Sequence, residues 1–351
     1  MALSLININK NSERCSLFLV VIVLCSVGLS GCDSGSSDKQ QVTFSGPMMG
    51  TEYRVTVIKD SSIDSDCLEA EVLKAMNSVN QSMSNYIADS EISDFNRLPA
   101  NQTQKLSADL LEVISEAISI SVMSDGAFDV TLAQAIDAWG FGPEGKITQR
   151  PSAVDIESLR TTVGVDKLIL SEGSLIKTVN GLEISLSAIA KGYAVDKVAL
   201  VLKSLGLTRY LVNIGGELRA SGRSADDKLW RVGIEKPHIL GGIQEIVKLD
   251  NVAIATSGDY RNYLVVDDQQ FSHMIDPRTL MPIYHRLALV SVISESAMTA
   301  DALATAMMAM GEQEAWDFAQ NNDLAAYLII RGVNEGEYAV QLTDKFEAYL
   351  Q

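Results

Sequence analysis

The chain has 351 residues, of which 47% are hydrophobic and 21% are charged, and its formal net charge is −17. These fractions are typical of a globular protein and exclude disorder over most of the chain. The negative charge argues against nucleic acid as a partner, because phosphate backbones are bound by basic surfaces. An anionic substrate would need a metal ion to help it bind.

The first 31 residues are typical of a secretory signal peptide. Lys10 and Arg14 precede an apolar run over 17–27, which is too short to span a membrane as a helix. L-S-G and Cys32 follow as a lipobox, so we predict that Cys32 is the acylated first residue of the mature chain. Cleavage after small residues without lipidation is the alternative. Removing the signal, whose net charge is +1, leaves −18 on the mature chain.

A lipid on Cys32 would hold the protein at a membrane surface. Asp33 follows it, and in enteric-type bacteria an aspartate at this position generally signals retention at the inner membrane. We therefore expect an inner-membrane lipoprotein that faces the periplasm. Residues 32–41 are predicted to form the lipidated cysteine and a polar tether, and residues 42–351 the folded domain.

The folded part combines blocks of short strands with separate blocks of helices. Strand-like residues at 42–58 are interrupted at Gly46-Pro47 and Gly50. Short strands within 168–184 are split at Gly173 and at Asn180-Gly181, a hairpin signal. Without regular strand-helix-strand alternation, an α+β fold with antiparallel sheets is favoured over a doubly wound one. The other predicted elements are helices at 68–83, 106–123, 188–205, 297–310 and 312–321, and strands at 210–214, 217–221, 230–235, 244–249, 252–257, 263–266, 288–293, 325–331 and 338–342.

Several common catalytic signatures are absent from the sequence. It contains no G-x-x-x-x-G-K-[ST], no G-x-S-x-G and no H-E-x-x-H. With three histidines in the chain, a site built from several histidines is nearly excluded. Nucleotide hydrolysis by a P-loop, esterase chemistry and zinc chemistry are therefore disfavoured.

The first candidate site lies in the apolar segment 296–311. Asp301 and Thr305 are four residues apart and share one face of the predicted helix. Carboxylate and hydroxyl oxygens are ligands suited to Mg2+. A reading without metal is also open, in which Asp301 is a charge near the helix start and Thr305 bonds back to the carbonyl of residue 301.

A second candidate is S-L-S-A-I-A-K-G-Y-A-V-D at 185–196, where a strand end runs into a helix start. Free N–H groups and Lys191 one turn in would suit an anion, although Lys191 is equally explained as a solvated helix residue. A third is A-F-D at 127–129 with W-G-F-G at 139–142, whose aromatic residues suit either a flat-ring clamp or a core cluster. A fourth is H-M-I-D-P at 273–277, in which His273 is either a turn residue or a general base.

The order of these segments, more than any one of them, resembles the ApbE family. The resemblance runs from about residue 42 to the C-terminus and implies an ApbE-like, T-fold-related architecture. Members are flavin transferases, which take FAD and attach FMN by a phosphoester bond to a threonine of a partner protein. The matching motifs are M-G-T at 49–51, S-x-Y at 84–86, S-E-I-S-D-F-N at 90–96, A-F-D-V-T at 127–131, W-G-F-G at 139–142, S-A-I-A-K-G-Y-A-V-D at 187–196, N-I-G-G-E at 213–217, A-T-S-G-D-Y-R at 255–261, H-M-I-D-P at 273–277 and A-D-A-L-A-T-A at 300–306.

The resemblance also implies roles for individual residues. Many relatives have aspartate where this chain has Ser185, whose hydroxyl keeps a hydrogen bond but not the charge. Mg2+ or Mn2+ would be bound by Asp301, Thr305 and the main-chain oxygen of Ala188, with that of Ala304 as a further candidate. The implied FAD residues are Met49, Tyr86, Ala127, Phe128, Asp129, Ser185, Lys191 and Ile275.

The implied reaction is metal-assisted phosphoryl transfer in which a threonine hydroxyl attacks the FMN phosphorus and AMP leaves. His273 is the candidate base, with Asp276 orienting its ring, and Asp301 is the second residue assigned to catalysis. The implied acceptors are flavinylated subunits of Na+-pumping NADH:quinone oxidoreductase or Rnf-type complexes. Two alternatives stay open: an FAD pyrophosphatase that releases FMN and AMP, and a periplasmic FAD-binding lipoprotein.

Overall fold

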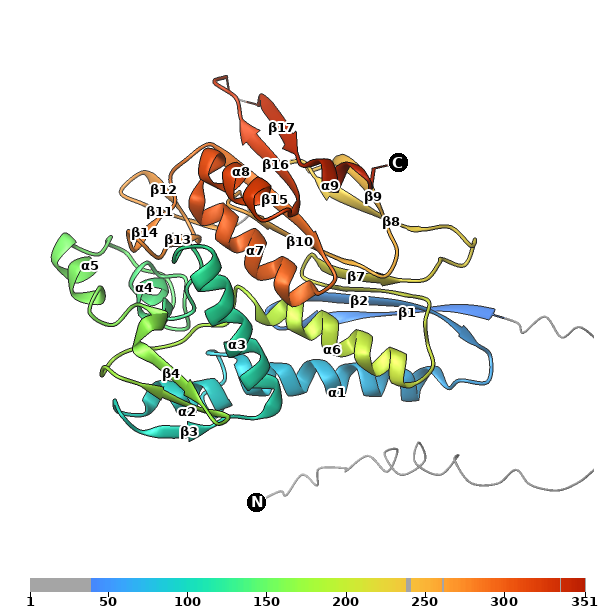
Figure 1. Ribbon diagram of the computed structural model, residues 1–351, viewed down its shortest axis with the longest axis horizontal. Helices are drawn as coiled ribbons and strands as arrows, with labels where there is room; N and C mark the ends of the chain where they lie inside the picture. The colour runs from blue at the N-terminus through green and yellow to red at the C-terminus, as the bar shows by residue number, and fades with distance from the viewer. Residues whose placement is uncertain (1–38, 238–240, 261, 335, 351) are drawn as a thin grey trace, which may run out of the picture.

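The computed structural model describes residues 39–237, 241–260, 262–334 and 336–350 (Figure 1). The predicted signal peptide, Cys32 and Asp33 lie outside these residues. Across the described ranges, no helix is both long and apolar enough to cross a membrane. The first strand begins at Lys39, so the last three residues of the predicted tether belong to the sheet.

Helices and strands occupy most of the positions expected from the sequence. The helices are α1 (Ser65–Met83), α2 (Glu91–Arg97), α3 (Ala108–Met123), α4 (Ala133–Ala138), α5 (Ala153–Leu159), α6 (Ala190–Ser204), α7 (Ala297–Met310), α8 (Glu312–Asn321) and α9 (Asp344–Glu347), with a 3-10 turn, η2, at Val165–Lys167. The strands are β1 (Lys39–Met48), β2 (Thr51–Asp60), β3 (Thr103–Lys105), β4 (Leu168–Ser171), β5 (Ser174–Lys177), β6 (Tyr210–Ile214), β7 (Glu217–Ser221), β8 (Trp230–Glu235), β9 (Ile243–Leu249), β10 (Ala253–Gly258), β11 (Tyr263–Val266), β12 (Gln269–Ser272), β13 (Ile275–Asp276), β14 (Met281–Pro282), β15 (Leu287–Ser294), β16 (Ala325–Arg331) and β17 (Tyr338–Leu342).

An eight-stranded sheet in the order β1-β2-β6-β7-β10-β15-β16-β17 forms the centre of the fold. All of its neighbouring strands are antiparallel. The order divides into two sets of four, each made of a strand pair, a helical connection and a second strand pair. The first set is β1-β2 and β6-β7, and the second is β10-β15 and β16-β17. This arrangement confirms the predicted α+β fold with antiparallel sheets.

Each face of the sheet has its own covering layer (Figure 1). Helices α1, α3, α6, α7 and α8 pack on one face, where Val290 and Val292 of β15 point into their core. The β8–β9 hairpin and α9 cover the other face, where Leu289 and Ile293 of the same strand contact Trp230 and its neighbours. Side chains of a strand alternate between faces, so β15, which is buried on both sides, has an apolar sequence interrupted only by Ser291 before its last residue.

Turn positions account for most differences from the expected strands. The strand continues through Gly46-Pro47 because β1 is an edge strand, where a missing N–H is tolerated. The chain reverses at Met49-Gly50, where both residues have positive φ, 51° and 73°, as a two-residue hairpin turn requires. Gly173 lies in the β4–β5 turn as predicted, but the hairpin at Asn180-Gly181 was wrong. Asn180 instead accepts a hydrogen bond from the backbone of Ala100.

Helices α6 and α7 cross at very short range, and this crossing positions the site described below. A Cβ on Gly192 would lie 2.8 Å from the Cα of Met298 and closer still to the carbonyl of Ala297. Asp196, one turn further along α6, fixes the start of α7 by accepting from the N–H of Met298 at 3.0 Å. Arg219 of β7 in turn lies 2.6 Å from Asp196. The crossing therefore depends on a glycine and on the half-buried carboxylate of Asp196.

We expect Gly192→Ala to lower the free energy of unfolding by about 1–3 kcal/mol, because the added methyl group must separate the two helices. Alanine is a better helix former than glycine, so helix propensity alone would predict a higher free energy of unfolding for the variant. Urea denaturation measures the change. Leu200→Ala on the same helix, at a side chain that is 62% exposed, is the control. Wild-type stability of the glycine variant would show that the crossing carries no such constraint.

Candidate active site

A cavity of about 1140 Å³ opens beside the crossing of α6 and α7. Its wall includes the β1–β2 turn, the start of α6, the β6–β7 turn, the end of β10 and one face of α7. The side chains or backbones of all the residues assigned above to FAD, metal or catalysis line it, with Ala304 outside the lining. These residues are Met49, Tyr86, Ala127, Phe128, Asp129, Ser185, Ala188, Lys191, His273, Ile275, Asp301 and Thr305.

A lysine between two buried carboxylates forms the charged centre of the cavity. The Nζ of Lys191 lies 3.7 Å from Asp301 Oδ2 and 3.5 Å from Glu217 Oε1. Burial alone would lower the pKa of Lys191, but the charges of Asp301 and Glu217 outweigh it and raise that pKa. Burial raises the pKa of Glu217 to about 7, an effect that Lys191 opposes and Asp301 reinforces. Lys191 is therefore a fixed cation and not a solvated helix residue.

The residues expected to bind a metal ion, Asp301, Thr305 and Ala188, line the same cavity. Asp301 is 2% exposed, and its Oδ2 accepts from the N–H of Gly192 at 3.0 Å. In a regular helix that N–H would bond to the carbonyl of Ala188, which among the described residues receives no such bond. Thr305 lies one turn from Asp301, with its hydroxyl 3.3 Å from that of Ser257. A carboxylate, a hydroxyl and a free carbonyl are a hard-oxygen set that fits Mg2+.

Histidine and cysteine ligands have no part in this centre. Within the ranges that the structure describes, no group of three or more His, Cys, Asp or Glu side chains is positioned to hold a metal ion. The back-bonded role considered for Thr305 is not what the side chain shows, since its hydroxyl pairs with Ser257 across the cavity wall. The donor set therefore favours a hard divalent cation over zinc.

His273 lies on the insertion between β10 and β15 and faces the cavity. Its Nδ1 is 3.0 Å from the carbonyl oxygen of Asn262. A carbonyl can only accept, so Nδ1 carries the proton and Nε2 is left with its lone pair. Burial and the charge of Lys191 lower the pKa of His273, against a smaller opposing effect of the Asn262 bond and Asp259. A neutral imidazole with a free Nε2 is the form that a general base requires.

The prediction for the group that orients this histidine was wrong. Asp276 was predicted to orient the His273 ring, but its carboxylate instead pairs with Arg278 at 3.1 Å. The ring is oriented by the Asn262 carbonyl and by Phe141, whose ring centroid is 6.3 Å away in an edge-on arrangement. Sequence neighbours on a tight turn point in different directions, so proximity along the chain was a poor guide.

The remaining predicted residues differ in how free they are to meet a ligand. Asp129 uses both oxygens internally, accepting from Thr131 and from the N–H of Val165. Burial raises its pKa, against the lowering effect of those hydrogen bonds. Tyr86 is 70% exposed, and its hydroxyl donates to the carbonyl of Phe141 at 3.2 Å. The hydroxyl of Ser185 lies 3.2 Å from that of Ser187 at the cavity wall.

Several supporting residues were not predicted from the sequence. Asn85 and Asn96 both donate to the carbonyl of Ile184, at 2.7 and 2.9 Å, and so fix the segment that leads to Ser185. The buried Lys177 donates to the carbonyls of Leu182 and Asn96. Glu217, in the N-I-G-G-E motif, was also missed as a site residue. Isolated polar residues in a sequence carry no signal of which distant backbone group they will bind.

A smaller cavity of about 520 Å³ adjoins the first. Both are lined by Tyr86, Ser185, Asn262 and His273. The smaller one extends along the W-G-F-G loop, which contributes Gly140, Phe141 and Gly142. His273 can therefore be reached from two directions.

The fold is shared with flavin transferases of known structure. The structure matches flavin transferase ApbE from Vibrio cholerae with a TM-score of 0.82 at 38% identity, covering 89% of this chain and 100% of that one. It matches the flavinyl transferase ApbE of Pseudomonas stutzeri with a TM-score of 0.82 at 37% identity, covering 89% and 97% of the two chains.

The chain belongs to the ApbE family, since residues 49–328 match the family's sequence profile. A relative named FAD:protein FMN transferase from Vibrio cholerae is 40% identical over 305 residues, which is 86% of this chain and 90% of the relative. A relative of the same name from Haemophilus influenzae is 37% identical over 324 residues, 90% and 93% of the two chains. The resemblance seen in the motifs is confirmed.

Proposed function

We propose that this protein is an FAD:protein FMN transferase, an enzyme that moves the FMN part of FAD to a threonine hydroxyl of an acceptor protein. The observation that carries the proposal is that one cavity collects all the residues implied for FAD and metal except Ala304, in a chain of the ApbE family. The relatives bearing this name span nearly the whole chain.

Asp301, Thr305 and the carbonyl of Ala188 would hold Mg2+, or Mn2+, in this proposal. When bound, the ion would offset the negative charge of the FAD pyrophosphate. Support for it comes from the hard-oxygen donor set and from the freed Ala188 carbonyl next to Asp301.

The protein's own groups bind and orient the reactants. Lys191, permanently charged, binds a pyrophosphate oxygen, and Nε2 of His273 takes the proton of the acceptor hydroxyl. A bond forms between that hydroxyl oxygen and the FMN phosphorus, while the bond from this phosphorus to the bridging oxygen breaks. AMP leaves with the bonding electron pair. Because such transfer relies mainly on positioning, the rigid α6–α7 crossing matters as much as the base.

Location and acceptor are part of the proposal. The lipobox at Cys32 and the following Asp33 support an inner-membrane lipoprotein on the periplasmic side. Flavinylated subunits of Na+-pumping NADH:quinone oxidoreductase or Rnf-type complexes are the proposed acceptors, on the strength of the family resemblance. With water in place of the threonine, the same cavity would act as an FAD pyrophosphatase; without turnover, it would simply bind FAD.

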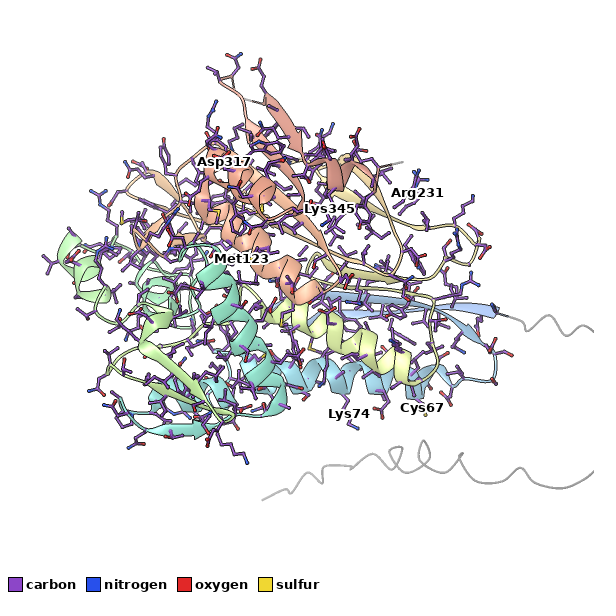
Figure 2. All side chains as sticks on the ribbon, in the orientation of Figure 1. Cys67, Lys74, Met123, Arg231, Asp317 and Lys345 are labelled. Atoms are coloured by element: carbon purple, nitrogen blue, oxygen red, sulfur yellow. The ribbon has the colours of Figure 1, made fainter. Side chains whose placement is uncertain are left out.

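Asp301→Ala should abolish transfer, because it removes the one carboxylate of the predicted metal set. The assay mixes a soluble form starting after Cys32 with FAD, Mg2+ and an acceptor domain, and detects flavin fluorescence of the acceptor in a gel. We expect a fluorescent band with wild type and none with the variant or with EDTA. Asp317→Ala removes an exposed carboxylate on α8 and is the matched control (Figure 2).

The same assay separates the alternatives. Metal-dependent release of FMN and AMP without a labelled acceptor would indicate the pyrophosphatase. FAD that stays bound and unchanged would indicate the binding protein. A fluorescent acceptor with Asp301→Ala would contradict the proposed metal site.

His273→Ala should bind FAD normally yet transfer FMN at least about 100-fold more slowly, as expected for loss of a general base. Burial and the nearby Lys191 charge lower the pKa of His273, so its base form persists below the ordinary value of 6.5. The wild-type rate should therefore decline only below that pH, and the variant should lack this acidic limb. His285→Ala removes a histidine outside the cavity lining and serves as control. A wild-type rate in His273→Ala would refute the assignment.

A further inference from the structure

Glu217 lines the cavity and has one buried side-chain oxygen without a hydrogen-bond partner. The side chain belongs to the first residue of β7 and is 3% exposed. Its Oε1 lies 3.5 Å from Lys191 Nζ, whereas Oε2 has no hydrogen-bond partner. Buried polar atoms are almost always paired, so an unpaired carboxylate oxygen at a cavity wall calls for a ligand.

The β6–β7 turn holds this carboxylate in place. Gly215 has φ of +70°, and a Cβ there would lie 3.2 Å from Oε2 of Glu217 and 2.9 Å from Thr51. Gly216 donates its N–H to the side chain of Asn213 at 3.0 Å, which tightens the turn. The carboxylate therefore lies beside Lys191 and close to the backbone of Gly215, where any larger residue would crowd it.

In its ionised form, the form that pairs with the cation of Lys191, Glu217 only accepts hydrogen bonds, so the partner missing from Oε2 is a hydrogen-bond donor. Phosphate oxygens are excluded for the same reason and because of their charge. Lys191, the adjacent cation, is the group that suits the pyrophosphate. In a flavin dinucleotide each phosphorus is joined directly to a polyol, the ribityl chain on one side and the ribose on the other. A donor hydroxyl thus lies within a few bonds of whatever phosphate Lys191 binds.

We infer that Oε2 of Glu217 accepts a hydrogen bond from a sugar hydroxyl next to the pyrophosphate and so selects a phosphate that carries a polyol. The inference rests on the proposed function, since it assumes that a flavin dinucleotide fills this cavity. It makes Glu217 a substrate-binding residue. If its role were only to hold Lys191, Oε1 would suffice and Oε2 would remain unexplained.

The test is calorimetric titration of FMN, AMP and inorganic pyrophosphate, each with Mg2+, into wild type and Glu217→Gln. In the variant the amide oxygen should face Lys191 and the NH2 group should face the ligand, so the acceptor is lost without a change of shape. We expect about tenfold weaker binding of the ligand whose hydroxyl is recognised. Pyrophosphate, which has no hydroxyl on carbon, should bind as to wild type. Weakening of FMN alone assigns the ribityl chain, and weakening of AMP alone assigns the ribose.

Two outcomes would overturn the inference: unchanged binding of all three ligands, or equal weakening of all three, which would mean that Glu217 acts through Lys191. Lys191→Gln is expected to weaken the binding of all three ligands, pyrophosphate included. It therefore provides the reference for an effect that acts through Lys191. Wild-type protein that binds neither FMN nor AMP would refute the proposed function itself. If Glu217→Gln does not fold, wild-type affinities for AMP and FMN can be compared with those for analogues lacking single hydroxyls. Equal affinities throughout that series would also overturn it.

Discussion

The close crossing of α6 and α7 is the constraint on which the rest of the site depends. Because Gly192 has no side chain, its N–H reaches Oδ2 of Asp301 on the opposite helix at 3.0 Å. That bond links the helical layers of the two sets of four strands, since α6 belongs to the first set and α7 to the second. It also diverts the N–H that would have occupied the carbonyl of Ala188. The bond that fixes the crossing of the two helices therefore also leaves the carbonyl oxygen of Ala188 available to a metal ion.

Both sets contribute polar side chains to the cavity. Lys191 and Glu217 come from the first set, and Asp301, Thr305 and His273 come from the second or its insertion. An active site at such a junction is sensitive to how the two sets pack, which gives a physical reason for the half-buried pair of Asp196 and Arg219 at the start of α7. Removing one partner of such a pair leaves the other charge partly desolvated and uncompensated. Residues distant from the reacting atoms therefore share in positioning them.

Sequence patterns predicted the long elements well, because burial repeats with the period of a helix or strand; α7 and α8 begin and end where their apolar patterns do. They failed where structure depends on distant contacts. The short helices α2 and α4 have too few turns for a periodic signal, and Asn180-Gly181 forms a turn without a strand beyond it. Residue chemistry singled out Asp301, Thr305, Lys191 and His273 as candidates, whereas Met49 and Tyr86 were assigned only through the motif resemblance. Glu217 was not predicted as a site residue because two glycines followed by a glutamate indicate only a hairpin turn. The contact with Lys191 appears only in the folded structure.

Charge balance explains why an acidic protein can handle an anionic substrate at this point. Among the described residues that line the larger cavity, Lys191 is the one lysine or arginine, facing the carboxylates of Asp301 and Glu217. The trio carries a net charge of −1 with all three groups ionised, so a pyrophosphate alone would be repelled. A divalent cation on the oxygens of Asp301 and Thr305 would reverse that sign to +1. The same residues that make anion binding weak without metal would therefore make it strong with metal, and in the proposed function this couples FAD binding to the ion that activates it.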